Sequence, residues 1–231
     1  MMKHDEKKLT LENDNLTDND VALLNGFSSL KVLQIGGCSS TTKMSVTGST
    51  FNLLPTSLEE LTLRCLGNLI DAGIANLQHL TNLRKLTIVW SGVVTGSTFN
   101  LFPKSLEELE LVGLPFLTDA GIANLHRLPR LRKLKISWNR TITGSTFTLL
   151  PTSLEELELN DIENITDAGI IHLQHLIKLK KLVVTYNLFI TGTTFNLLPS
   201  SLEELGLNNM DSLTDAGIAL RNSPSFNILS C

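Results

Sequence analysis

The segment Ser-Leu-Glu-Glu-Leu recurs at a constant interval of 48 residues along this chain, beginning at Ser57, Ser105, Ser153 and Ser201. Other residues keep the same interval. A proline stands two positions before each copy, and an Asp-Ala-Gly-Ile segment follows each copy. A fixed period of this length is typical of repeat architectures, in which each unit packs only against its neighbours and one core runs through the stack. The period therefore predicts a solenoid.

Each 48-residue unit contains two shorter units that share the pattern Leu-x-x-Leu-x-Leu, with Ile or Val at some of the last positions. The steps between them alternate between 25 and 23 residues, and the regular copies begin at Leu58, Leu83, Leu106, Leu131, Leu154, Leu179 and Leu202. An earlier copy begins at Leu30, Leu9-x-Leu11 fits in part, and Phe226 to Cys231 form a degenerate last copy. We therefore predict ten strand-bearing repeats.

The pattern predicts a strand and a helical return segment in each repeat. The last two apolar residues of Leu-x-x-Leu-x-Leu point to one face of a short strand. A parallel neighbour needs a crossover of a dozen or more residues, for which 23 to 25 residues leave room. In the 25-residue repeats this crossover is apolar at helical spacing, as in Ile122–Leu128, with Thr118 or Asp119 as the N-cap. In the 23-residue repeats we expect only a turn or two of helix around Ser97–Phe102, which Pro103 ends.

With these repeats the chain resembles the leucine-rich repeat family, whose unit is L-x-x-L-x-L-x-x-N/C-x-L over roughly 20–29 residues. The resemblance covers residues 9–231. The element Leu-Thr-Asp-Ala-Gly-Ile, at Leu117–Ile122 and Leu213–Ile218, looks like the cysteine-containing and ribonuclease-inhibitor-like branches, and like repeats of bacterial effectors delivered into host cells. The resemblance implies an α/β solenoid: a curved right-handed arc with a parallel β-sheet on its concave face and helices and short 3-10 turns on its convex face.

The Asn/Cys position of the family pattern differs between the two kinds of repeat. In the 25-residue repeats it is apolar, with Leu66, Leu114, Ile162 and Met210. In the 23-residue repeats it holds Ser91, Asn139 and Asn187, and in the longer repeat that begins at Leu30 it holds Cys38. We therefore expect only the repeats with Cys38, Ser91, Asn139 and Asn187 to bind loop backbone groups through this side chain.

Bulk properties favour one soluble domain. The chain has 231 residues, of which 42% are hydrophobic, and a net charge of -4. We expect a polar lead-in over residues 1–8 and a single repeat domain over residues 9–231.

No apolar stretch is long enough for a membrane span, the N-terminal residues do not resemble a secretory signal, and weak acidity argues against nucleic acid as a partner. The three cysteines, Cys38, Cys65 and Cys231, show no disulfide spacing, so we expect reduced thiols. The predicted location is cytoplasmic, or inside a host cell after delivery without a classical signal peptide.

Charges alternate in sign from strand to strand on the face that points away from the core. One predicted row across the sheet is Glu60, Lys85, Glu108, Lys133, Glu156, Lys181 and Glu204. A second row is Glu59, Arg84, Glu107, Arg132, Glu155, Lys180 and Glu203. A surface of this kind can bind a polar ligand. We favour a self-neutralising ladder that sets the order of the repeats, because each acid lies between bases that already pair with it.

The loops that follow the strands vary most between repeats, which indicates a binding face along one edge of the solenoid. Within these loops Trp90, Trp138 and Tyr186 occupy one register, and aromatic residues of this kind are favoured interface anchors. The alternative is that they pack down on loop neighbours. The candidate partner-binding residues are Trp90, Trp138, Tyr186, Arg64, Phe116, Arg140, Asp161 and Phe189.

Signals for enzymatic chemistry are weak. His172 and His175 lie three residues apart but lack companions at metal-ligand spacing. Cys65 has no base in the neighbouring registers that would activate it as a nucleophile. No phosphate-binding or nucleophile-elbow motif occurs, and the glycine of each Asp-Ala-Gly-Ile segment is expected to serve packing. We therefore expect no catalytic residue, no metal and no cofactor.

These observations favour a non-enzymatic protein–protein interaction module, either a cytosolic adaptor or a pathogen effector that binds a host protein. A second hypothesis is the substrate-recognition part of a ubiquitin-ligase-type assembly. A third is a receptor for a glycan or small ligand that uses the aromatic edge. Because no evident cap follows the last repeat, we also expect a homodimer through the C-terminal edge.

Overall fold

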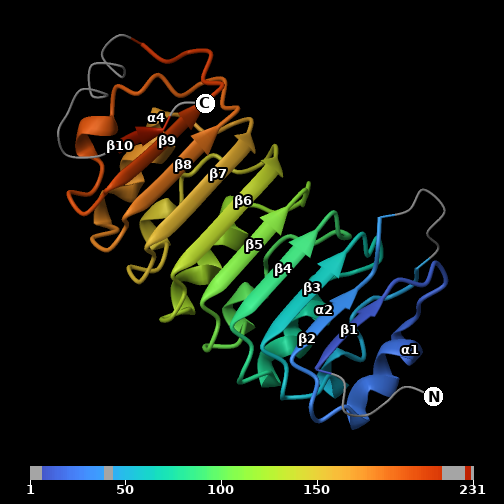
Figure 1. Cartoon of the computed structure of the whole chain (residues 1–231). Coiled ribbons are helices and arrows are strands. Elements are labelled where there is room, and N and C mark those ends of the chain that lie inside the picture. Colours follow the sequence, from blue (N-terminus) through green and yellow to red (C-terminus); the bar gives the residue numbers. More distant parts are fainter. Residues whose placement is uncertain (1–6, 39–43, 215–226, 230–231) are drawn as a thin grey trace.

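The computed structural model describes residues 7–38, 44–214 and 227–229. Ten strands form a single sheet in which every neighbouring pair is parallel and the strands follow chain order (Figure 1). The strands are β1 (Lys8–Leu11), β2 (Val32–Ile35), β3 (Glu60–Arg64), β4 (Lys85–Val89), β5 (Glu108–Val112), β6 (Lys133–Asn139), β7 (Glu156–Ile162), β8 (Lys181–Thr185), β9 (Glu204–Asn208) and β10 (Asn227–Leu229). The ten predicted strands are confirmed.

The return segments alternate between two kinds. Every second repeat carries a short α-helix followed at once by a 3-10 segment: α1 (Asp18–Ala22) and η1 (Leu23–Gly26), α2 (Asp71–Ala75) and η3 (Asn76–His79), α3 (Asp119–Ala123) and η5 (Asn124–Arg127), α4 (Asp167–Ile170) and η7 (Ile171–His175). The other repeats carry only a 3-10 turn: η2 (Phe51–Leu53), η4 (Phe99–Leu101), η6 (Phe147–Leu149) and η8 (Phe195–Leu197).

The predicted N-cap and the predicted stop before proline are also confirmed. Thr118 is the N-cap of α3, and its side-chain oxygen accepts a hydrogen bond from the backbone N–H of Gly121 at 3.2 Å. The 3-10 turn η4 ends at Leu101, two residues before Pro103. Proline lacks the N–H that a continuing helix needs, so the chain turns there toward the next strand.

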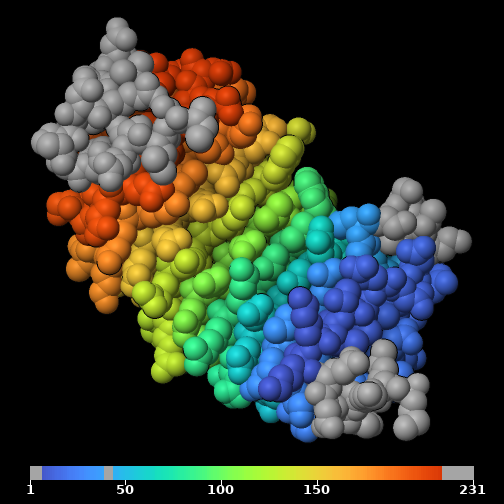
Figure 2. All heavy atoms as spheres, in the orientation of Figure 1, coloured from blue at the N-terminus to red at the C-terminus, as the bar shows by residue number. Residues whose placement is uncertain are grey.

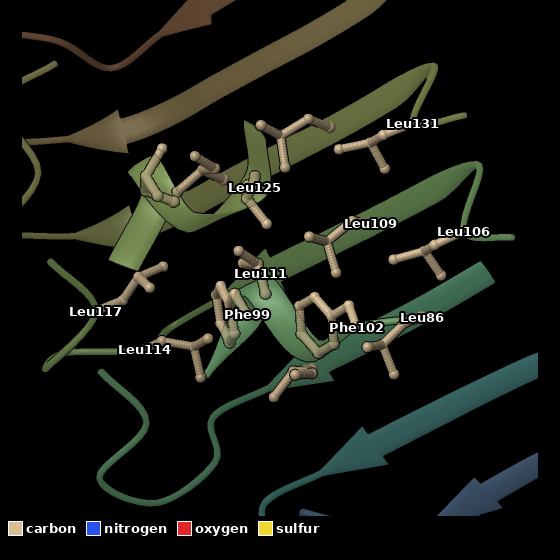
Figure 3. Packing of buried hydrophobic residues seen from close by; sticks show 14 of the residues in the cluster. Leu86, Phe99, Phe102, Leu106, Leu109, Leu111, Leu114, Leu117, Leu125 and Leu131 are labelled. Carbon is tan, nitrogen blue, oxygen red and sulfur yellow. The ribbon is translucent and has the colours of Figure 1, made fainter. Parts of the chain in front are cut away.

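One apolar core lies between the sheet and the helical segments (Figure 3). Strand β5 contributes Leu109 and Leu111, each 1% exposed, and Leu106 is buried just before the strand begins. From the return segments come fully buried phenylalanines such as Phe99, whose ring stacks on that of Phe102 with centroids 4.6 Å apart. Each repeat forms one band across the molecule and touches the bands beside it (Figure 2). No repeat closes its own core, so stability depends on stacking.

A carboxylate joins each helical repeat to the one that follows. The side chain of Asp119, the first residue of α3, accepts hydrogen bonds from Thr143 Oγ1 at 2.8 Å and from the backbone N–H of Gly144 at 3.0 Å. The same bonds link Asp18 with Thr47 and Gly48, Asp71 with Thr95 and Gly96, and Asp167 with Thr191 and Gly192. The recurring aspartate and Thr-Gly pair are therefore two halves of one inter-repeat contact.

The glycine of Asp-Ala-Gly-Ile serves packing, as predicted. A Cβ on Gly121 would lie 2.2 Å from the carbonyl oxygen of Thr95 and 2.9 Å from the Cα of Gly96. Because neither position has room for a side chain, the backbones of successive repeats approach directly.

The sheet is open and uncurled, so the arc predicted from the sequence is shallow (Figure 1). Curvature in a solenoid arises where the helical layer is wider than the strand spacing of about 4.8 Å. Here helices of four or five residues alternate with three-residue 3-10 turns. The helical layer therefore needs little more width per repeat than the strands do, and the arc stays shallow.

The prediction of reduced thiols is wrong for two of the three cysteines. Cys38 and Cys65 form a disulfide, with their Cα atoms 5.3 Å apart. Their separation of 27 residues is not a spacing that predicts a disulfide from the sequence. In the structure, strands β2 and β3 pair with Ile35 opposite Leu63, and this register brings the loops after the two strands together. Cys231 lies outside the described residues.

Two further expectations concern the ends of the chain and membranes. β10 is the last strand of the described sheet, and the flanking residues 215–226 and 230–231, on which the expected homodimer also depends, lie outside the described residues. Among the helices of the described ranges, none combines the length and the apolar character that crossing a membrane requires.

Candidate functional site

The carboxyl ends of strands β3 to β9, together with the loops that follow them, hold the candidate binding residues, and we call this region the rim. Trp90, Trp138 and Tyr186 follow the buried core positions of β4, β6 and β8, and are 50%, 58% and 59% exposed. These values favour the interface hypothesis over the alternative that the aromatic residues pack down into the rim.

The backbone conformation explains why these large side chains point outward. Trp90, Trp138 and Tyr186 have φ angles of 48°, 58° and 54°, in the left-handed region. The backbone N–H groups of Trp90 and Tyr186 still bind the neighbouring strand, with Trp90 N donating to Val112 O at 2.9 Å. A bulky residue in this region costs on the order of 1 kcal/mol. The rim therefore holds three aromatic side chains at a backbone position where glycine or asparagine would fit at lower cost.

The positions opposite the aromatic residues complete the row. The strand register places Gly113 between Trp90 and Trp138, and Asp161 between Trp138 and Tyr186. Gly113 and Asp161 share the positive φ, at 62° and 54°. The turn is thus common to successive repeats, and only its side chain differs.

Trp90 and Trp138 meet above Gly113. Their ring centroids are 6.1 Å apart, and the ring planes are tilted by 55°. A Cβ on Gly113 would fall 2.2 Å from Cε3 of Trp90, so the indole occupies the space that any larger residue would need. The glycine therefore allows two tryptophans from alternate strands to reach each other.

A hollow of about 300 Å³ adjoins this pair, and we call it the indole hollow. Its lining is Trp90, Gly113, Pro115, Trp138, Asn139, Arg140, Asp161 and Glu163. Arg140 Nε lies 2.7 Å from Glu163 Oε1, so these two charges are paired. The carboxylate of Asp161 forms no hydrogen bond or ion pair with any residue that the structure describes.

The structure thus brings four of the predicted residues, Trp90, Trp138, Arg140 and Asp161, around one hollow. It places the other four elsewhere. Tyr186 continues the row beyond Asp161, and Phe116 and Phe189 are 54% and 55% exposed in the loops after β5 and β8. Arg64 lines a different hollow, beside Cys38 and Met44.

The polar side chains of the 23-residue repeats hold the rim loops from inside. Asn139, 1% exposed, donates from Nδ2 to the carbonyl of Leu114, and its Oδ1 accepts from the backbone N–H of Ile142. Ser91 and Asn187 make similar contacts and are equally buried. The predicted role of this position is confirmed for these three residues, whereas Cys38 forms the disulfide instead.

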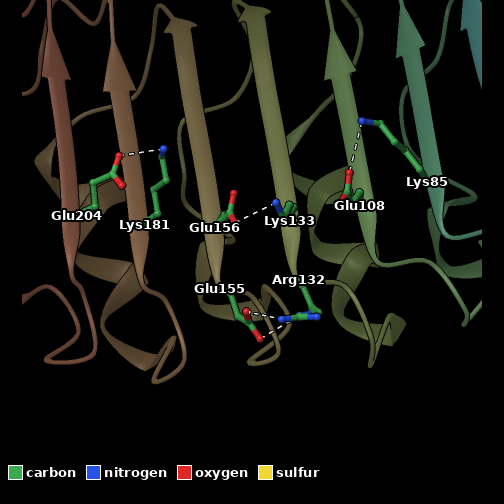
Figure 4. A network of polar contacts seen from close by, with 8 residues as sticks. All are labelled: Lys85, Glu108, Arg132, Lys133, Glu155, Glu156, Lys181 and Glu204. Atoms are coloured by element: carbon green, nitrogen blue, oxygen red, sulfur yellow. Dashed lines mark hydrogen bonds and ion pairs between the residues drawn. The ribbon is translucent and has the colours of Figure 1, made fainter. Parts of the chain in front are cut away.

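The charge rows on the strand face lie in the predicted register (Figure 4). Each paired base binds the acid of the next strand rather than both neighbours: the pairs are Lys85–Glu108, Arg132–Glu155, Lys133–Glu156 and Lys181–Glu204, at 2.8 to 3.4 Å. The hydrogen bond from Arg132 lowers the pKa of Glu155, and the hydrogen bond to Glu110 raises the pKa of Lys85. These pairs support the ladder hypothesis.

The histidines of the return segments contact backbone carbonyl groups. Nδ1 and Nε2 of His175 lie 2.9 and 3.0 Å from the carbonyl oxygens of His172 and Leu150. His172 Nδ1 lies 3.0 Å from the carbonyl oxygen of Gly144. Within the described residues, no three His, Cys, Asp or Glu side chains are grouped so that they could hold a metal ion.

Sequence comparisons identify no relatives, because no family model and no curated protein matches the chain. Solved structures do match. Internalin C2 (InlC2) of Listeria monocytogenes str. 4b F2365 aligns over 97% of this chain and 80% of its own, with a TM-score of 0.59 and 19% identity. Internalin InlF of the same strain aligns over 80% of this chain, with a TM-score of 0.57 and 21% identity. This chain spans about half of the InlF chain, since 49% of the latter is covered.

A third match comes from an octameric complex of latrophilin 3, Unc5D and FLRT2, in which FLRT2 is the component labelled LRR. It covers 100% of this chain and 85% of the matched chain, with a TM-score of 0.53 and 19% identity. At these identities the comparisons establish the fold. Together with the ten parallel strands and their alternating return segments, they show that this protein is a leucine-rich repeat solenoid.

Proposed function

We propose that this protein is a non-enzymatic binding module whose rim recognises another protein. One observation carries the proposal: Trp90, Trp138 and Tyr186 are held half-exposed, in one row, by a backbone conformation that is unfavourable for large residues. Strain of this kind persists where the surrounding structure over-determines it, and it is concentrated at functional sites. Tryptophan and tyrosine are also the side chains that most often dominate interface energetics.

The strand face is a weaker candidate surface. Its hollow is lined by Lys85, Glu108, Glu110, Lys133 and neighbouring charged residues, and most of these already form ion pairs. A partner would have to break such pairs before it could use the charges. The tryptophans of the rim form no ion pairs, so a partner can bind them without breaking any.

The experiment is affinity capture with two matched triple variants. Trp90→Ala/Trp138→Ala/Tyr186→Ala removes the aromatic row. Leu23→Ala/Leu149→Ala/Ile177→Ala removes three side chains of the helical segments and their connections that are 75%, 50% and 72% exposed. We expect the control to retain the captured protein and the aromatic variant to lose it. When the captured protein is purified, its Kd for the aromatic variant should be at least about 100-fold weaker than for the unchanged protein.

Capture of the same protein by both variants would contradict the proposal. The identity of the captured protein then separates the finer hypotheses. Ubiquitin-ligase components would indicate the recognition part of such an assembly, and a host protein would indicate an effector. Binding on a glycan array that the aromatic variant loses would favour the glycan-receptor hypothesis.

The disulfide bears on where the module acts. Disulfides persist in oxidising compartments and are rare in the cytosol. The Cys38–Cys65 bond therefore favours a site of action outside the reducing cytosol over the cytoplasmic location expected from the sequence. Alkylation of thiols at the moment of cell lysis, followed by mass measurement, tests this: modification of both residues in the native compartment would support the cytoplasmic location.

We also propose that the protein forms a homodimer through the C-terminal edge. Within the described sheet β10 is the last strand and pairs with β9, and the end strand of a sheet is where a second copy can add a strand of its own. Sedimentation velocity over a wide concentration range is expected to show a monomer–dimer equilibrium, and a monomer at every concentration would contradict it.

A further inference from the structure

We infer that the indole hollow binds a cationic side chain, the guanidinium of an arginine or the ammonium of a lysine, that projects from the protein partner. This inference rests on the proposed function and adds to it the chemistry of recognition. Three features of the hollow support it, namely its aromatic faces, its uncompensated carboxylate and its size.

The aromatic faces come from two different strands. Trp90 and Trp138 are 50% and 58% exposed and stand 6.1 Å apart with a tilt of 55°, so the pair forms an open wedge rather than a closed stack. Cations are attracted to the face of an indole ring, and tryptophan is the strongest of the aromatic residues in this respect. Pro115 adds an apolar surface against which the methylene stem of the partner's side chain can pack.

The charge of the lining is negative. Arg140 and Glu163 neutralise each other at 2.7 Å, which leaves Asp161 as the unpaired charge of the hollow. Asp161 follows Asn160 on β7 and therefore stands next to Trp138 of β6 across the sheet. A cation on the indole face thus has a carboxylate in the neighbouring register, and the chain as a whole carries a net charge of -4 that favours its approach.

The size suits one long side chain. A volume of about 300 Å³ is at the lower end of the range for small-molecule sites, and is enough for an extended arginine or lysine with some water. A folded element of a partner would have to lie along the row, with only one residue entering the hollow.

The chain provides its own reporter for this site. Trp90 and Trp138 are the only tryptophans in the sequence, so the two indole N–H signals in an NMR spectrum both arise from the hollow. We would titrate N-acetyl-arginine methylamide and, at matched ionic strength, N-acetyl-citrulline methylamide, which has nearly the same shape but no charge. Trp90→Phe assigns the two signals.

We expect the arginine probe to shift both signals with a Kd on the order of 1–10 mM, and the citrulline probe to bind about fivefold or more weakly. Asp161→Asn should reduce the affinity for the arginine probe about fivefold. Asparagine suits the backbone here, because Asn209 occupies the corresponding position two strands away with a φ of 52°. Asp211→Asn, which removes an exposed carboxylate outside the hollow, serves as the control and should change nothing.

Equal shifts by both probes, an unchanged affinity in Asp161→Asn, or no shift with either probe would overturn the inference. These results are separable from those of the capture experiment. Loss of a captured protein in the aromatic variant, combined with no preference for the arginine probe, would leave the rim as a protein-binding surface without cation recognition. Saturable binding of arginine without any captured partner would support the site chemistry and remove support from the proposed function.

Discussion

The indole of Trp90 lies across Gly113, so close that a Cβ at position 113 would fall 2.2 Å from the ring. This contact joins a 23-residue repeat to the 25-residue repeat that follows it, and it lets Trp90 reach Trp138 on the far side of the glycine. The shape of the candidate site therefore depends on a residue that has no side chain.

Replacing Gly113 should separate the two tryptophans. We expect Gly113→Asn to keep the left-handed turn, because asparagine tolerates a φ near 62°, but to displace the Trp90 ring. The free energy of unfolding should fall by about 1 kcal/mol, and the near-ultraviolet circular dichroism of the indole pair should weaken. Gly67→Ala is the control, since a Cβ there meets nothing within 4 Å. An unchanged aromatic spectrum in Gly113→Asn would argue against the contact.

Removing an inter-repeat carboxylate should destabilise the whole stack. Asp119→Ala loses the bonds to Thr143 and Gly144, and leaves those donors without their charged acceptor. We expect a loss of about 2–3 kcal/mol in urea-induced unfolding, because hydrogen bonds to charged groups are stronger than neutral ones. Asp119→Asn keeps one acceptor oxygen and should lose less. An unchanged stability of Asp119→Ala would show that the hydrogen bonds contribute little.

The coupling between Arg132 and Glu155 should depend on pH. The bidentate pair, at 3.0 and 2.8 Å, lowers the pKa of Glu155 below its ordinary value of 4.5. A carboxyl group with a lowered pKa stabilises the folded state above its unfolded pKa, and this contribution is lost as the pH falls through the folded pKa. Both side chains are partly exposed, so solvent screens the pair and we expect its coupling free energy at pH 7 to be small.

A double-mutant cycle with Arg132→Ala and Glu155→Ala, measured at pH 7 and again below the folded pKa, checks this expectation. The cycle for Arg84 and Glu107 is a matched control from the same row, because among the described residues these two form no ion pair with each other. A coupling of the same size at both pH values would contradict an ionic origin.

Reduction of the disulfide should loosen the N-terminal repeats first. The bond closes a loop across a separation of 27 residues, for which chain entropy gives a stabilisation of up to about 3–4 kcal/mol. In hydrogen exchange with a reductant present, amides of β1 and β2 should lose protection while those of β5 to β7 keep it, because distant repeats are coupled only through their neighbours. Cys38→Ser/Cys65→Ser should behave like the reduced protein and should not respond to reductant. Unchanged protection of β1 and β2 on reduction would contradict the role of the bond.

Much of the fold follows from the sequence because repeat length translates directly into strand register. Residues that hold the same place in successive repeats, such as Lys133 and Glu156, are forced to be neighbours across a parallel sheet. The charge rows and the row of Trp90, Trp138 and Tyr186 could be predicted for this reason. The inter-repeat carboxylates were missed, although the recurrence of Asp119 and of Thr143-Gly144 at one fixed spacing was a signal that could have identified them.

The candidate site could be predicted only in part. The sequence places aromatic residues at the rim, but it does not show that Trp90 and Trp138 touch while Tyr186 stands apart. Nor does it show that Glu163 neutralises Arg140 and leaves Asp161 without a partner among the described residues. These relations depend on rotamers and on the left-handed turn, and neither leaves a periodic trace in the chain.

The amino-acid sequence by itself determines that this protein is a stack of parallel coils, because the spacing of its leucines allows only stacking to bury them. Tertiary structure alone decided the shallow arc, the bond between Cys38 and Cys65, and the wedge of Trp90 and Trp138 above Gly113. A repeat specifies which residues become neighbours. It does not specify how their side chains turn once they meet, because that depends on the space and the charges that the assembled coils leave between them.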